Sequence, residues 1–560
     1  MSASERSLEG EQLEPGGKND ILPLLERLKG AIWVRRPILG EIMVRRGQKA
    51  LYSYAEDFFD VNPSPLLDQR KDELIEIVYN LLNERLGTHV AEGVKDQLEK
   101  LPLVSTADHH GPINHPFFVN SNIITALPYF ETADRDIKYL IDFSFASISA
   151  NNSSFPRGIL FHGGEQGTGE LIRVPILPDK LKMSVVYQLR AFNKEDLDKA
   201  VSEIDKSTRA GKIHNGRGER VKKFLKTFFG NEEVLAAKDL STQITKINFD
   251  MWPNLFHAEK ASKEEISAKK KSKKIPDLIY LEIETIVKEL LIKHHFFNKQ
   301  SLVNRFLFHP DSQRLVYKYF DKLPGSFNLK DGWGTYIFWG LDDKMHRVRL
   351  ALDKGKLHSA DNKIVIKWDP ENLQKALDNK QIFPNMALCY TLVALYYGFK
   401  CLGGFSQVND LTLTKDAWKK YLVSIGEFTE AEALNPVQTK ELGGDGMIVA
   451  FMETPGGTLV PAMGIDMILE KQDTSYKKYI EISKKLMLKD TMAPMLPDIY
   501  SVVYSSYERD PSLTVITADE IVNAKGFYDE IKSKEKEGRS SKVGIRQKDA
   551  IDYKLITSQV

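Results

Sequence analysis

Pro102-Leu-Val-Ser-Thr-Ala-Asp-His-His-Gly-Pro-Ile-Asn-His-Pro-Phe-Phe-Val-Asn-Ser-Asn122 decides the fold, because it joins a short apolar run, a polar loop and the start of a helix. Residues 101–106 are apolar and partly β-branched, which predicts a strand that enters a core. A Gly-Pro pair at 111–112 prevents a regular continuation, so a loop follows. Pro116 then predicts a helix over 117–129, since proline is tolerated in a first helical turn. Backbone N–H groups and the helix dipole attract anions at such a junction, so the stretch predicts a ligand site.

Four ionisable side chains fall within eight positions of this loop. Loop histidines are commonly solvated or capping residues, and adjacent histidines point in different directions. The chain has only 12 histidines, however, and three of them with an aspartate lie here, which favours a functional site. They would contact a nucleotide phosphate and donate protons to it, or bind a metal. The catalytic candidates are Asp108, His109, His110 and His115, and the ligand-binding candidates in the same stretch are Ser105, Thr106, Gly111 and Asn114.

Metal binding is the alternative interpretation of the same four residues, Asp108, His109, His110 and His115. Their spacing contains no helical His-x-x-x-His pair, and no cysteine stands beside them. The leading expectation is therefore a site without a metal.

The composition limits the classes of protein. At 560 residues the chain is long enough for two to four domains, and its 42% hydrophobic and 28% charged residues are those of an ordinary globular protein. Lys and Arg number 78 against 77 Asp and Glu, a net charge of +1, so no whole-protein field attracts nucleic acid or an acidic membrane, and neither partner is expected. Two cysteines, Cys389 and Cys401, are too few for a disulfide framework, which favours the cytoplasm. Neither a signal peptide nor an apolar run of about 18 residues is present, so no membrane span is expected.

A second candidate loop follows the strand predicted within residues 136–149. Its sequence is Asn151-Asn-Ser-Ser-Phe-Pro-Arg-Gly158. Small hydrogen-bonding residues that close on Arg-Gly are typical of ligand loops in α/β sheets, and equally of a well-capped turn. Asn152, Ser153 and Arg157 are the ligand-binding candidates here. The glycine-rich residues 162–170 lack a Gly-Lys-Ser/Thr ending, so we expect a hairpin loop there rather than a phosphate loop.

The pattern along the chain predicts an organisation in six segments. Apolar residues recur at helical spacing before residue 100, lysines crowd residues 269–274, and residues 383–407 are the most apolar stretch, with a Gly403-Gly404 turn that opens a helix. The expected segments are a disordered tail (1–20), a helical N-terminal segment (21–100), a first half of the core (101–257), a helical lysine-rich connector (258–300), a second half of the core (301–470) and a C-terminal helical region with a polar tail (471–560), through which a homodimer could form.

Separated segments resemble the bacillithiol-biosynthesis cysteine-adding enzymes. The resemblance lies in the strand, loop and helix of residues 102–128, in Pro384-Asn-Met-Ala-Leu388 before a strand and Gly403-Gly404, and in the aromatic hairpin with Phe338-Trp339 and Arg347-Val-Arg-Leu350. It implies a Rossmann-like core with inserted connecting segments and a helical, coiled-coil arm, and an activity that adds an amino acid. It also adds Asn385, Gly403 and Gly404 to the ligand-binding candidates. The Asp108-His109-His110 triplet is similar to that of the Asp-His-His phosphoesterases, which implies manganese and hydrolysis.

The sequence therefore predicts an α/β protein with a Rossmann-like core, a helical N-terminal segment and a helical C-terminal arm. The leading function is a ligase- or transferase-like enzyme that acts on a nucleotide or a phosphorylated small molecule. In it His110 and His115 stabilise developing negative charge, Asp108 orients one imidazole, and Asn152 and Arg157 hold the other end of the ligand. The alternatives are a hydrolase that uses a divalent metal and a non-catalytic binding protein with a degenerate enzyme fold.

Overall fold

The computed structural model describes residues 21–525, except 63, 132–136, 165–168, 188, 257–274, 454–458 and 471–473. The predictions for the N-terminal tail, for the lysine-rich run at 269–274 and for the tail after residue 525 lie outside the described residues. Among the described helices, none is both long and apolar enough to cross a bilayer.

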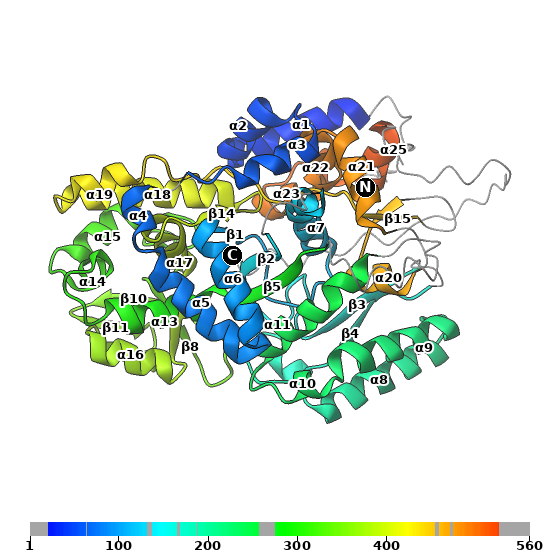
Figure 1. Cartoon of the computed structure of the whole chain (residues 1–560), viewed down its shortest axis with the longest axis horizontal. Coiled ribbons are helices and arrows are strands. Elements are labelled where there is room, and N and C mark those ends of the chain that lie inside the picture. The colour runs from blue at the N-terminus through cyan, green and yellow to red at the C-terminus, as the bar shows by residue number, and fades with distance from the viewer. Residues whose placement is uncertain are drawn as a thin grey trace, which may run out of the picture.

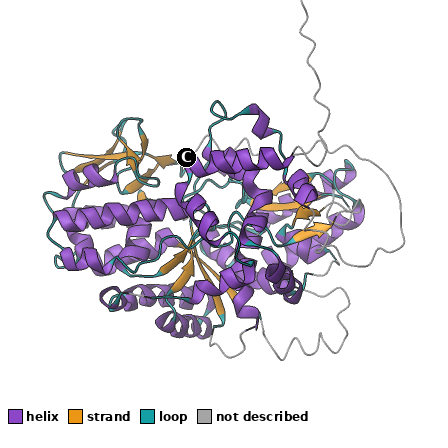
Figure 2. Ribbon diagram, turned by 90° about the horizontal axis from the view of Figure 1, so that it is seen from above, coloured by secondary structure: helices purple, strands orange, loops and turns teal. Residues whose placement is uncertain are grey.

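A four-stranded parallel sheet lies at the centre of the molecule (Figure 2). Its strands are β1 (Leu103–Ser105), β2 (Tyr139–Ser144), β5 (Asp277–Glu282) and β14 (Lys400–Leu402), in the order β14-β1-β2-β5. The mixed α/β fold is thus confirmed, as is the strand predicted at the start of the histidine stretch. The predicted connector at 258–300 was wrong in one respect, because β5 of the core sheet lies inside it. That strand is buried on both faces and reads as a continuous apolar run, which periodicity does not separate from a helix.

Helices cover both faces of the sheet (Figure 1). Side chains alternate along each strand, so Leu140 joins one buried core and Ile141 the other. The first core is built with α1 (Ile21–Arg35), α2 (Pro37–Arg46), α3 (Leu51–Glu56), α7 (Pro116–Glu131), α8 (Lys194–Arg209), α9 (Asn215–Phe224), α11 (Leu240–Met251), α20 (Gly464–Leu469), α21 (Tyr476–Lys485) and α23 (Leu496–Val503). The second is built with α5 (Lys71–Leu86), α6 (Thr88–Lys100), α13 (Ile283–Leu290), α14 (Leu302–Phe308), α15 (Ser312–Phe320), α16 (Pro370–Asp378), α17 (Met386–Tyr390), α18 (Gln407–Ser424) and α19 (Phe428–Ala433).

The two neighbouring strands β1 and β14 send the chain in opposite directions. After β1 the chain continues into α7, whose side chains join the first core, whereas after β14 it continues into α18, most of whose buried side chains join the second. Where adjacent parallel strands diverge in this way, their carboxyl ends leave a crevice that commonly binds ligands. The carboxyl edge between β1 and β14 is therefore where the fold places a site.

Antiparallel strands flank the central sheet. β3 (Gly158–His162) pairs with β4 (Leu171–Pro175), which confirms the hairpin predicted around residues 162–170, although residues 165–168 are outside the described part. β8 (Phe338–Leu341) and β9 (Arg347–Val348) form the predicted aromatic hairpin. The remaining strands are β6 (Phe327–Asn328), β7 (Trp333–Gly334), β10 (Leu350–Asp353), β11 (Lys356–Ser359), β12 (Val365–Lys367), β13 (Ile382–Pro384), β15 (Phe451–Glu453) and β16 (Leu459–Pro461).

A buried ion network joins the β3–β4 hairpin to the histidine loop, which is the loop between β1 and α7 that carries Asp108 and the three histidines. Arg217 of α9 is fully buried and pairs with Asp466 of α20 and with Glu470. The Asp466 carboxylate also accepts the imidazole N–H of His162, at the end of β3, at 2.5 Å. Helix α20 in turn begins where the Gly464 N–H donates to the main-chain oxygen of Asn114 at 2.9 Å. The network therefore supports the loop from outside the sheet.

Candidate functional site

Three polar side chains stand side by side near the carboxyl edge of the sheet. Ser105 of β1 is in register with Asp142 of β2, which is in register with Tyr280 of β5. Because facing residues of parallel strands share a face, all three point towards α7 and α11. Polar groups in the middle of an apolar core are expensive to bury, so this row marks a position with a purpose beyond packing.

Asp142 is fully buried, and neither of its carboxyl oxygens makes a well-formed hydrogen bond to a described residue. Burial raises the pKa of Asp142 to about 8, and the nearby Ser105 and Ser144 hydroxyls oppose this shift only in part. At neutral pH the carboxyl is therefore mostly protonated. It holds a proton in a dry environment in which the Ser105 and Ser144 hydroxyls are its nearest polar partners, and a better acceptor that enters the site could take that proton.

Asp108, in the loop after β1, lies close to Asp142. Its Oδ2 accepts hydrogen bonds from the Asn122 side chain at 2.6 Å and from the Tyr280 hydroxyl, while its Oδ1 has no partner among the described residues. Burial raises the pKa of Asp108 well above its usual range, and the charges of Asp142 and Asp445 raise it further. Two carboxyls that disfavour each other's ionisation titrate as a pair, so one proton is retained between them.

His110 is held as a neutral imidazole behind this pair. The Ser241 hydroxyl donates to Glu282, so its oxygen accepts the Nε2–H of His110 at 2.7 Å. Nδ1 is then left to accept the Ser144 hydroxyl at 2.8 Å, a tautomer that follows from the network. Burial lowers the pKa of His110 to about 4. The imidazole thus orients Ser144, at the end of β2, without carrying charge.

His109 joins the two predicted ligand loops. Its Nδ1–H donates to the Asn152 side-chain oxygen at 2.8 Å, and the same oxygen accepts the hydroxyl of Ser153 at 3.2 Å. Burial lowers the pKa of His109. The structure therefore brings together the loops after β1 and β2, although His109 faces away from the acid pair.

His115 and Asn114 lie where the loop enters α7. The His115 Nδ1 accepts the N–H of Phe117 at 3.3 Å, and burial lowers the pKa of His115 to about 3. Asn114 is fully buried, and neither atom of its amide has a partner. Gly111, earlier in the loop, gives its main-chain oxygen to the Asn248 amide of α11 at 2.9 Å. Asn114 is thus a second side chain with hydrogen-bonding capacity to spare.

Arg157 and Asn385 have local roles that account for their contacts. Arg157 binds the Asn151 side chain, the main-chain oxygen of Leu177 and the Asp179 carboxylate, and so closes the turn before β3. Asn385 caps α17 by accepting the N–H of Leu388 at 2.9 Å. No contact joins either residue to Asp108 or Asp142 in the described part of the chain.

The glycine turn after β14 closes the crevice from the other side. A Cβ at Gly403 would strike the Gln407 side chain, and one at Gly404 would strike the Asp445 carboxyl. Gln407 in turn donates to the Thr106 hydroxyl at the end of β1. Gln407 and Asp445 therefore line the crevice between β1 and β14. Burial raises the pKa of Asp445 to about 7, so this group too can hold a proton near neutral pH.

The four residues of the alternative metal site, Asp108, His109, His110 and His115, are directed to different partners. Asp108 contacts Asn122 and Tyr280, and the three histidines contact Asn152, the two serines and the start of α7. Among the described residues no group of three or more His, Cys, Asp or Glu side chains is close enough together to hold a metal ion.

Sequence reasoning missed Asp142, Tyr280, Ser241 and Asp445, which complete the site. A signal existed for Asp142, since it is the one charged residue within Tyr139-Leu-Ile-Asp-Phe-Ser144, an otherwise apolar buried strand. A charge in such a position is rare without a reason. Ser241 and Asp445 gave no comparable signal, because they come from distant segments that only the fold brings to the sheet.

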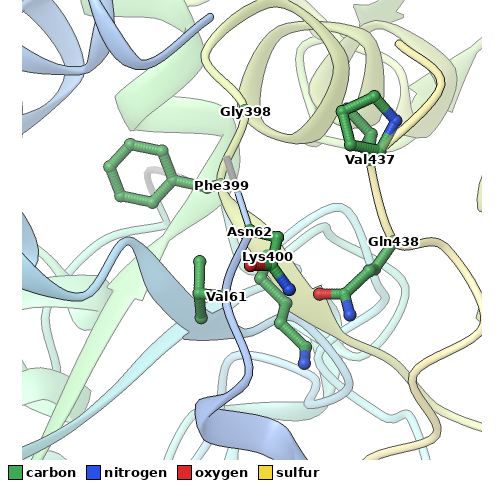
Figure 3. A pocket seen from close by; sticks show the side chains of 8 residues that line it. Val61, Asn62, Gly398, Phe399, Lys400, Val437 and Gln438 are labelled. Atoms are coloured by element: carbon green, nitrogen blue, oxygen red, sulfur yellow. The ribbon is translucent and has the colours of Figure 1, made fainter. Parts of the chain in front are cut away.

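A small pocket lies at the opposite end of β14 (Figure 3). Lys400 begins that strand, and its ammonium group donates to the main-chain oxygens of Asp57 and Asp60 at 2.9 Å. Burial lowers the pKa of Lys400. Because both donations hold the turn after α3, the lysine is accounted for as a structural cation. The pocket is lined by Val61, Asn62, Gly398, Phe399, Lys400, Pro436, Val437 and Gln438.

A scan against models of known protein families gives no match, and a search of curated proteins finds no similar sequence.

Proposed function

We propose that the chain is an enzyme of the ligase or transferase kind, with a Rossmann-like core, that binds a small molecule at the carboxyl edge between β1 and β14. Asp108 and Asp142 transfer protons to and from this molecule. The order β14-β1-β2-β5, with the fourth strand beside the first and helices on both faces, supports the Rossmann-like arrangement.

The observation that carries the proposal is that, among the described residues, neither Oδ1 of Asp108 nor either oxygen of the nearby Asp142 makes a well-formed hydrogen bond, although the Ser105 and Ser144 hydroxyls lie close to Asp142. Buried polar atoms in proteins are almost always hydrogen-bonded, and an orphaned one costs roughly 1–3 kcal/mol. Three such atoms at the edge where parallel sheets bind ligands support a role in which the ligand supplies the missing partners.

The chemistry follows from the two protonation states of the pair. A carboxyl whose pKa lies near the working pH serves as both acid and base, which is how buried carboxylates are tuned for catalysis. Tyr280 and Asn122 fix Asp108 on one side, so its free oxygen keeps a constant direction. The histidines have a supporting part in this proposal: His110 orients Ser144, and His109 holds the loop that carries Asn152.

Asp142→Asn tests this function directly, because it keeps the shape of the side chain and removes the titratable proton. The wild type would be screened against nucleotides, phosphorylated metabolites and amino acids by thermal shift, since a ligand that binds only the folded state raises the melting temperature. We expect the compounds that stabilise the wild type to be turned over, and turnover to fall about 100-fold or more in Asp142→Asn.

Asp498→Asn is the matched control. Asp498 is an acid on α23 whose pKa burial raises to about 7, and it lies outside the crevice. It should leave turnover unchanged. Equal turnover in Asp142→Asn and Asp498→Asn would sink the proposal and favour the non-catalytic alternative.

A further inference from the structure

Helix α18 begins beside the crevice, and its N-terminus has no side-chain cap. Ser406 precedes the helix without a capping hydrogen bond from its side chain. The N–H groups of Val408, Asn409 and Asp410 donate to the main-chain oxygens of Gly404 and Ser406, so the dipole of the 18-residue helix is what places partial positive charge at this point. This alone identifies no ligand, but it defines the charge that a ligand here would carry.

Arg36 faces this N-terminus from the junction of α1 and α2. Its Nε lies 3.4 Å from the Ser406 hydroxyl oxygen, and burial lowers the pKa of its guanidinium. The nearest opposing charge is that of Asp410, in the first turn of α18, yet no ion pair joins the two within the described residues. Arg36 therefore interacts with the Asp410 carboxyl electrostatically, and its guanidinium is not neutralised by a direct ion pair among the described residues.

Two buried side chains with free polar atoms complete the surroundings. Asn409 is 4% exposed; its Oδ1 accepts the N–H of Ile38 at 3.0 Å, whereas its Nδ2 has no acceptor in the part of the chain that the structure describes. Asp410 is 7% exposed, and its Oδ1 is equally unpaired. Since Ile38 follows Arg36 by two residues, the free amide lies in the same junction between α18 and α2. These orphaned atoms are the independent sign of a missing ligand.

The geometry points to an oxyanion subsite at the N-terminus of α18, in which Arg36, the Asn409 amide and the Asp410 carboxyl bind a carboxylate or phosphate group. It rests on the proposed function in taking the adjoining crevice as the place of the rest of the ligand. The oxyanion accepts from the guanidinium, which now donates only to the Ser406 hydroxyl and to the main-chain oxygen of Arg35, and it supplies partners for Nδ2 of Asn409 and for the protonated Asp410.

The protonation of Asp410 makes the binding depend on pH. Burial raises the pKa of Asp410 to about 7, and Arg36 opposes the shift. Other ionisable groups near this junction are Arg35, whose charge lowers the pKa of Arg36, Tyr390 of α17, whose pKa Asp410 raises, and Asp445, which lies against Gly404. A bound anion favours the protonated forms of Asp410 and Asp445. Binding of the anion therefore takes up a proton, and the affinity falls as the pH rises through 7.

Isothermal titration of the full chain with inorganic phosphate and, separately, with acetate tests the subsite at pH 6.5 and constant ionic strength. We expect saturable binding of at least one anion, and the tighter of the two identifies the group that the natural ligand carries. Arg36→Gln should weaken it about tenfold or more, the loss expected for a charge-assisted contact. Arg35→Gln is the matched control, since it removes the same charge from the adjacent position and should change the affinity less than twofold.

Two isosteric variants separate a specific site from general electrostatic attraction. Asn409→Asp keeps the acceptor for the Ile38 N–H but replaces the donor, and should also weaken binding about tenfold or more. Asp410→Asn supplies a permanent donor, and should retain binding at pH 8, where the wild type has lost it. Equal affinities in Arg36→Gln and Arg35→Gln, or no saturable binding of either anion, would overturn the subsite. Asp142→Asn should bind the anion normally, so failure of the acid pair and failure of the subsite are told apart.

Discussion

The Tyr280 hydroxyl donates a hydrogen bond to the Asp108 carboxyl and thereby joins β5, at the edge of the core sheet, to the loop after β1. Asp142 lies between them on β2, in register with Tyr280. This contact fixes the direction of Asp108 and places its free oxygen in the same buried space as the Asp142 carboxyl. The geometry of the acid pair therefore depends on a residue that takes no part in proton transfer itself.

Tyr280→Phe should destabilise the protein by roughly 1–3 kcal/mol, because it leaves Asp108 with Asn122 as its one remaining partner. The free energy of unfolding would be measured in urea at pH 7. Tyr129→Phe is the control, since the Tyr129 hydroxyl makes no hydrogen bond within the described part of the chain; it should change the stability much less. If the two variants are equally stable, the hydroxyl does not hold Asp108.

Asp142→Asn should make the protein more stable at neutral pH, by up to roughly 4 kcal/mol, because the buried acid must take up a proton on folding whereas the amide does not titrate. The pKa of Asp142 is raised to about 8 in the folded state, above that of the unfolded chain. Between about pH 4 and pH 8 the folded state holds a proton that the unfolded state has released, so the wild type loses stability as the pH rises. The variant lacks this loss. The difference in the free energy of unfolding between Asp142→Asn and the wild type, measured in urea, should therefore widen from pH 5 to pH 8.

A gain in stability with a loss of turnover is the pattern of a residue kept for function at a cost to the fold. If the difference in the free energy of unfolding between variant and wild type stays constant between pH 5 and pH 8, Asp142 ionises normally in the folded protein. That result would remove its role as a proton donor.

The sequence predicts those parts of the site that lie within one continuous stretch of the chain, and it does not predict the partners that distant segments supply. The strand, loop and helix predicted for residues 102–122 are present in the structure. A local pattern of apolar residues, a Gly-Pro pair and a proline determines them. The meeting of His109 with Asn152 agrees with placing both loops at one sheet edge. The role expected for Asp108 as the partner of an imidazole was not found, because Asn122 and Tyr280 occupy its carboxyl instead.

The partners of the loop were beyond local pattern reading for a physical reason. Tyr280 lies on a strand whose residues are buried on both faces, so its sequence carries neither the alternation of a half-exposed strand nor a helical period. Which strand stands beside β2 depends on pairing over more than a hundred residues, and no short-range signal encodes that choice.

The buried histidines should make the protein sensitive to mild acid. The pKa of His110 is lowered to about 4 by burial, below that of an exposed histidine, so the unfolded state binds a proton first as the pH falls. Stability is therefore lost between about pH 6.5 and pH 4, by up to roughly 3 kcal/mol for this residue. His110→Gln keeps a donor and an acceptor but does not titrate, and should remove part of that loss in urea denaturation. NMR of the imidazole should show His110 neutral at pH 6, and a charged ring at that pH would contradict the prediction.

Arg217→Met should be far more damaging than the loss of an exposed ion pair. Arg217 is fully buried and neutralises Asp466 and Glu470, so its removal leaves two carboxylates in a dry environment. Breaking such a network typically costs roughly 3–5 kcal/mol, whereas Arg45→Met, which loses only an exposed pair with Glu41, should be nearly neutral. Because α20 also holds the main chain of Asn114, we expect proteolysis or hydrogen exchange to show the histidine loop opening first in Arg217→Met. If the variant instead unfolds as one unit with an unchanged loop, the network stabilises the hairpin of β3 and β4 alone.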